Sequence, residues 1–125
     1  MPATVECLPD APIVILKFSD VVSRKDVTDT YLKGLESALR SHRTFYWVVD
    51  ILDAPTSYLM VVATLQEILQ GLVGAPIMPS MQIGCAGLPV MCAAFNTKIP
   101  SADVFFSRQE AMHFAQARFA EHALT

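Results

Sequence analysis

Apolar residues occur along this chain in two patterns, as short continuous runs and as longer segments with one apolar face. Continuous runs of about 4–8 residues are typical of strands buried on both sides of a parallel sheet. Apolar residues three and four positions apart are typical of helices that pack on one face. The expected strands are 4–8, 13–18, 45–52, 81–86 and 103–106, and the expected helices are 24–41, 58–71, a short one from about residue 89, and one from 107 to about 122.

The order of these elements predicts the fold class. A turn cluster at 9–12 joins the first two strands and favours an antiparallel hairpin. The remaining strands alternate with helices, as right-handed crossovers in a parallel sheet require. We therefore expect a single α/β domain over residues 1–125, with a mixed, mainly parallel sheet packed against helices. No repeat or long linker divides the chain.

Charge is scarce and unevenly placed. Charged residues make up 17% of the chain, against about 25% in typical soluble domains. Residues 54–97 contain a single charged side chain, Glu67. Glycine and proline residues break this stretch into pieces that are too short to cross a bilayer, so no membrane span is expected. The net charge of −3 and the absence of a basic block argue against a nucleic-acid partner.

The cysteines and the start of the chain suggest a compartment. Cys7, Cys85 and Cys92 are odd in number and form no CxxC pair, which favours free thiols in a reducing environment. The first ten residues lack the basic and apolar regions of a signal peptide. A cytoplasmic protein is therefore expected.

The helix expected from residue 58 is apolar on more sides than packing on a sheet requires. Its polar residues Gln66, Glu67 and Gln70 form one narrow stripe. An apolar excess of this kind indicates an interface, so a homodimer is expected. The alternative is a helix that a neighbouring segment covers as part of the core. The expected interface residues are Tyr58, Leu59, Val62, Leu65 and Leu69.

Four segments carry a resemblance to a known family. They are the hairpin-like start that ends in 13–18, VVDIL at 48–52, QIGCAGLPVMCAAF at 82–95 and DVFFSRQEAMHFA at 103–115. Their order over residues 4–120 resembles the STAS fold, the sulfate-transporter and anti-sigma-factor-antagonist type. The last segment is similar to the family's F-x-S-x-x-E-A helix start. The resemblance implies a regulatory, non-enzymatic module.

Antagonist-type STAS domains carry a phosphorylatable serine in a D-S-[SA]-G-like motif at the start of the helix after the central strand. Thr56 and Ser57 match that position, but the motif is absent. The chain therefore looks closer to the divergent STAS-like relatives, which include lipid-transfer-like members. Ser and Thr are also preferred helix caps, so Thr56 and Ser57 are expected to be either caps or a phosphosite.

Three residues are expected near the carboxyl ends of the strands, where α/β sheets bind ligands. Asp50 and Asp53 flank the end of the third expected strand, and Cys85 lies in the fourth. No nucleophile and base are recognisable as a pair, no spacing predicts a metal site, and no phosphate-binding loop is present. We therefore expect no catalytic residue, metal or cofactor.

These observations leave three hypotheses for function. The first is a non-enzymatic regulatory module that works through contact with a protein partner and self-associates through the 58–72 helix. The second is a module that binds a small apolar ligand or a lipid. The third is a small enzyme of unknown reaction that uses Asp50, Asp53 or Cys85.

Overall fold

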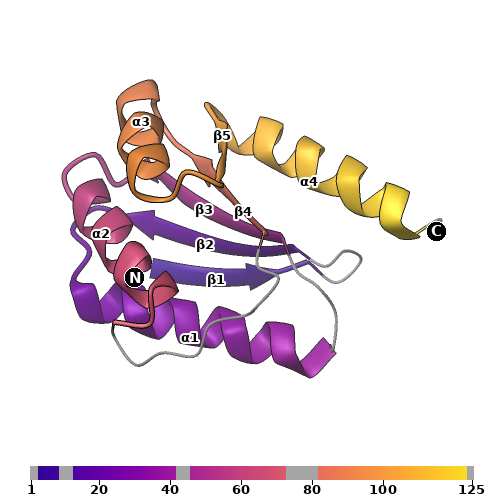
Figure 1. Cartoon of the computed structure of the whole chain (residues 1–125), viewed down its shortest axis with the longest axis horizontal. Helices are drawn as coiled ribbons and strands as arrows, with labels where there is room; N and C mark the ends of the chain where they lie inside the picture. The colour runs from indigo at the N-terminus through magenta and orange to yellow at the C-terminus, as the bar shows by residue number, and fades with distance from the viewer. Residues whose placement is uncertain (1–2, 9–12, 42–45, 73–81, 124–125) are drawn as a thin grey trace.

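The five apolar runs form one sheet, in the strand order β1-β2-β3-β4-β5 (Figure 1). The computed structural model describes residues 3–8, 13–41, 46–72 and 82–123. β1 pairs antiparallel with β2, and the later strands are parallel. The predicted α/β class is thus confirmed. The strands are β1 (Ala3–Cys7), β2 (Ile13–Ser19), β3 (Tyr46–Asp53), β4 (Gln82–Ala86) and β5 (Asp103–Phe105).

Four helices cover the sheet unequally. Every expected helix is present, and each begins within one residue of the predicted start. Residues of α1, α2 and α3 share one core cluster, whereas α4 contributes to a second cluster on the opposite face. The helices are α1 (Arg24–Ser41), α2 (Tyr58–Leu69), α3 (Pro89–Lys98) and α4 (Arg108–Ala123).

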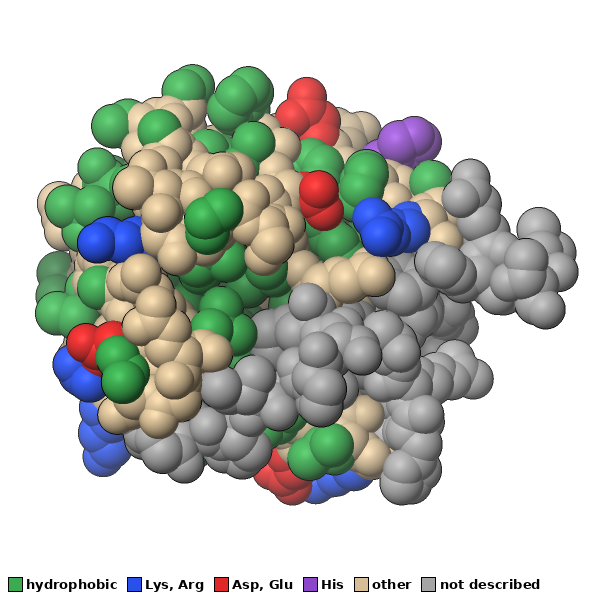
Figure 2. All heavy atoms as spheres, viewed as in Figure 1, with side chains coloured by type: hydrophobic (Ala, Val, Ile, Leu, Met, Phe, Trp, Pro, Cys, Tyr) green, Lys and Arg blue, Asp and Glu red, His purple; other side chains and the backbone are tan. Residues whose placement is uncertain are grey.

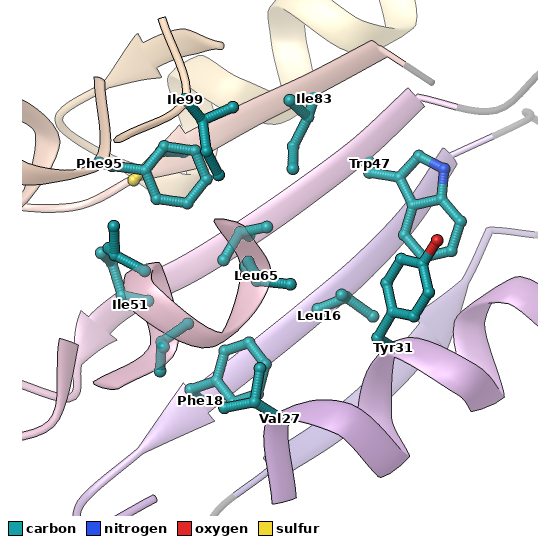
Figure 3. Close-up of a cluster of buried hydrophobic side chains, with 14 of the residues drawn as sticks. Leu16, Phe18, Val27, Tyr31, Trp47, Ile51, Leu65, Ile83, Phe95 and Ile99 are labelled. Atoms are coloured by element: carbon teal, nitrogen blue, oxygen red, sulfur yellow. The ribbon is translucent and has the colours of Figure 1, made fainter. Parts of the chain in front are cut away.

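The larger core lies between the sheet and α1–α3 (Figure 3). Alternate residues of β1, β2, β3 and β4 contribute to it, as the pleat of a strand requires. Tyr31 of α1 stacks on Trp47 of β3, with ring centroids 5.5 Å apart. Gly34 allows α1 to approach this pair closely, because a Cβ there would lie 2.7 Å from the indole ring. The 3–4 residue spacing of Val27, Tyr31, Leu35, Ala38 and Leu39 predicts one packed face for α1. That prediction is wrong for Leu39, which is 56% exposed.

Within the described parts of the chain, α4 is the only helix on the second face of the sheet, and it covers part of that face. α4 packs on β3, β4 and β5, with Ala111 and Ala115 buried against the sheet. Small residues on α4 and on β4 let the helix lie close to the strand, where Ala86 is fully buried. Phe114 packs against the rings of Tyr46 and Phe105 at one flank. The outward side chains of β1 and β2 lie beside α4 rather than beneath it.

The described helices also bear on the membrane question. In the parts of the chain that the structure describes, no helix is both long enough and apolar enough to cross a bilayer.

Candidate functional site

The carboxyl ends of β2, β3, β4 and β5 lie at one edge of the sheet, because these strands are parallel. Charged side chains from three elements meet there. Arg108, the first residue of α4, donates from Nε to Asp50 Oδ2 and from Nη2 to Asp53 Oδ2, the latter at 2.5 Å. Lys17 Nζ of β2 lies 3.7 Å from the same Asp53 oxygen. The guanidinium group of Arg108 therefore contacts both Asp50 and Asp53 and joins the two carboxylates.

Asp50 is the buried member of this cluster. Its side chain is 2% exposed, and a charge so removed from water requires a partner. Arg108 supplies one, while the backbone N–H of Leu52 donates to Asp50 Oδ1 at 3.1 Å. The hydrogen bond to Asp50 is the main reason that the pKa of Arg108 is raised. Both carboxylates are thus already hydrogen-bonded to the protein.

Arg108 was not recognised as a site residue from the sequence. The sequence does contain a signal for Arg108. Arg108 follows the end of β5, Asp53 is the last residue of β3, and the carboxyl ends of parallel strands lie at the same edge of a sheet. Ser107 and Glu110 have the spacing of a capping box, which predicts a helix start here. The box is present, since the N–H of Glu110 donates to Ser107 Oγ at 3.1 Å. That box fixes the start of α4 and so places Arg108 over β3.

A pocket of about 320 Å³ opens beside this cluster, on the part of the second face that α4 does not cover. We call it the open-face pocket. Its walls come from β1, β2, β3 and the first turns of α4. The floor of the pocket consists of side chains that are paired across β2 and β3. Lys17 lies beside Asp50 in one row, and Ile15 lies beside Val48 in the next. The lining residues are Thr4, Glu6, Leu8, Ile15, Lys17, Val48, Asp50, Arg108 and Met112.

Cys85 does not belong to this site. It lies beside Val49 in the parallel register, and both side chains belong to the core on the α1–α3 face. Burial raises the pKa of the Cys85 thiol, which keeps it protonated at neutral pH. Cys85 therefore lies near the carboxyl end of β4 but on the face of the sheet opposite to Asp50. Its neighbour Cys92 donates to the Gly87 carbonyl, with Sγ and O 3.3 Å apart.

Ser57 and Thr56 have different surroundings. Ser57 occupies the N-cap position of α2, but its side chain makes no capping hydrogen bond. Its hydroxyl instead donates to the carbonyl of Asp20 at 2.5 Å, and the N–H of Asp20 donates to Asp53 O at 2.9 Å. The cap interpretation is therefore wrong for the Ser57 side chain, which joins two loops. Thr56 is exposed.

The expected interface residues of α2 separate into two groups. Val62 and Leu65 are 2% and 1% exposed, so they belong to the protein's own core and cannot contact a partner. Tyr58 and Leu69 are partly buried against the same core. Leu59 alone is largely free, at 61% exposure. The prediction was wrong for the buried pair because the sheet and two neighbouring helices enclose more of α2 than the sequence indicates.

Leu59 belongs to a wider exposed surface. Six large apolar side chains follow β2, β3, β4 and β5 in the loops and first turns at the carboxyl edge. We call this surface the apolar edge. Figure 2 shows hydrophobic side chains gathered at the end of the molecule where α2 and α3 lie. The residues of the apolar edge are Val21, Leu59, Met60, Leu88, Val90 and Phe106.

Comparisons of the chain with protein-family models, with curated proteins and with solved structures found no match. The resemblance to STAS domains therefore stays a prediction. Among the residues that the structure describes, no three His, Cys, Asp or Glu side chains are grouped so as to hold a metal ion.

Proposed function

We propose that this chain is a non-enzymatic cytoplasmic interaction module of STAS-like type that pairs with a second copy of itself through the apolar edge. One observation carries the proposal. Of the ten large apolar side chains that are exposed in the described part of the chain, six lie at this single edge. Contiguous apolar patches on a protein surface mark interaction sites more often than scattered apolar residues do.

The loops that form the apolar edge are connected to one another. The Ser57–Asp20 hydrogen bond ties the loop before α2 to the loop before α1. The N–H of Gly87, before α3, donates to the Phe105 carbonyl at 3.0 Å, which ties in the loop before α4. α2 also packs against α3. The six side chains are therefore presented on a fixed surface, which lowers the entropic cost of docking.

A second copy of the chain fits the charge pattern of this surface. A two-fold symmetric interface sets each patch against itself, so a patch with net charge would repel its partner. Residues 54–66 and 84–97, which supply Leu59, Met60, Leu88 and Val90, contain no charged side chain. The one charge of α2, Glu67, forms a salt bridge with Arg24 of α1.

Sedimentation equilibrium of the native chain and of Leu59→Asp tests this proposal. At micromolar concentration we expect the native chain at twice its 13.7 kDa mass. The variant should stay folded, because Leu59 is 61% exposed, and its dimer dissociation constant should rise about tenfold or more.

Leu39→Asp is the matched control. Leu39 is similarly exposed, at 56%, but lies near the C-terminal end of α1, away from the apolar edge. It should leave the dimer intact. A monomeric native chain would overturn the proposal, and so would equal weakening by the two substitutions.

A further inference from the structure

The open-face pocket has an apolar inner part and a polar outer part. Ile15 and Val48 lie side by side on its floor, with Val48 only 2% exposed. Leu8 and Met112 complete the apolar lining from the two sides. Toward the carboxyl edge, the next row of the sheet holds Lys17 beside Asp50. A molecule seated here would place an apolar body over the floor and a polar group near these charges.

The charges around the pocket pair with one another, with one exception. Arg108 neutralises Asp50 and also contacts Asp53, whose second cationic neighbour is Lys17. Glu6 of β1 lines the same pocket, and no described residue forms an ion pair with it. It lies opposite Ile15 in the strand register, one row further from the edge than Lys17. When Asp53 is counted with the charges that line the pocket, the carboxylate without an ion-pair partner among the described residues is that of Glu6, an exposed side chain on the β1 side of the pocket.

We infer that the open-face pocket binds a small amphipathic cation, a molecule with one amine or ammonium group and an apolar body. The amine would donate to the Glu6 carboxylate, and the body would cover Ile15, Val48 and Met112. Charge-assisted hydrogen bonds are stronger than neutral ones, so the amine would add to the binding that the apolar body alone provides. An anionic ligand would be less favoured, because Lys17 and Arg108, the two cations that line the pocket, already pair with carboxylates. This site is separate from the apolar edge and does not depend on self-association.

Three six-carbon probes that differ only in the head group test this assignment. Hexylamine, hexanol and hexanoate would be titrated into the ¹⁵N-labelled native chain, and binding would be followed by amide chemical shifts. Hexylamine should shift the amides of Glu6, Ile15 and Lys17. Its dissociation constant should be about tenfold lower than that of hexanol, and hexanoate should bind most weakly.

The variant Glu6→Gln tests whether the Glu6 carboxylate causes the preference for hexylamine over hexanol. It should bind hexylamine no more tightly than hexanol, while Glu36→Gln, which removes an exposed carboxylate from α1, should keep the native preference. The inference is wrong if the native chain binds hexylamine and hexanol equally or prefers hexanoate. It is also wrong if the pocket amides do not shift, or if Glu6→Gln retains the preference for the amine.

Discussion

At the scale of the residue, Asp50 and Arg108 depend on each other unequally. Asp50 is almost completely buried, whereas the Arg108 side chain is 45% exposed and can be solvated from the pocket. Removing the arginine would leave a buried carboxylate without its cation. Removing the carboxylate would leave an arginine that water and Asp53 still satisfy. The pair therefore matters for stability mainly through the cost of an uncompensated Asp50.

Arg108→Met should lower the free energy of unfolding by about 2–3 kcal/mol, because Asp50 stays buried without its main partner. Asp50→Asn should cost less. Urea unfolding of both variants measures the difference. Arg40→Met is the control, since Arg40 pairs with Glu36 on the exposed surface of α1, and it should change stability by only about 0.5 kcal/mol. Similar losses in Arg108→Met and Arg40→Met would contradict this account.

At the scale of the element, α2 has a well-defined end. Gly71 follows the helix with a φ of 76°, a left-handed conformation that glycine adopts at little cost. Its N–H donates to Ile68 O at 2.9 Å, and the N–H of Leu72 donates to Glu67 O at 2.8 Å. This is the hydrogen-bond pattern of a Schellman motif. It satisfies two carbonyls at the end of the helix and stops α2.

Gly71→Ala should therefore destabilise the protein by about 1 kcal/mol, because a Cβ strains the left-handed backbone. Gly71→Asn should lose less, since asparagine tolerates this conformation better than alanine does. Thermal unfolding of the two variants tests the order. An alanine variant as stable as the native chain would show that the end of α2 carries no such strain.

Element types and boundaries could be predicted because they depend on local patterns. The apolar run at 45–52 is itself the strand that it predicts. The pairs Ser23–Asp26 and Ser107–Glu110 have the spacing of a capping box, and each lies at the start of its helix. Contacts between distant elements could not be predicted in the same way. Arg108 and Asp50 are 58 positions apart, and the burial of Val62 depends on how the sheet, α1 and α3 pack around α2.

At the scale of the whole molecule, ionisable groups that remain neutral contribute to the stability of the fold. Burial raises the pKa of the Cys85 thiol above its ordinary value of 9.0. Burial, together with the hydrogen bond to Asp103, raises the pKa of Tyr46 above 10.0. In the unfolded chain both groups ionise at their ordinary pKa. Their contribution to stability is therefore complete below that pKa and is lost as the pH rises above it.

The free energy of unfolding should accordingly fall between about pH 9 and pH 10.5, with a slope that approaches about 1.4 kcal/mol per pH unit for each group. Burial also raises the pKa of the Cys92 thiol. Cys85→Ala should reduce this slope, because it removes one of these ionisations. Urea unfolding at several alkaline pH values measures both slopes. A native chain whose stability does not change over this range would contradict the prediction.

The close packing of α4 on the sheet has a consequence for the shape of the open-face pocket. Ala111 and Ala115 do not line the pocket, yet they set how near the helix axis comes to β4. Met112 and Arg108 lie on the same helix as the two alanines. The small size of Ala111 and Ala115 therefore also determines how close Met112 and Arg108 lie to the floor of the pocket. A larger side chain at either alanine would act as a spacer and lift one wall of the pocket. Natural variation at these two alanines could thus alter which molecules fit, without changing any residue that touches them.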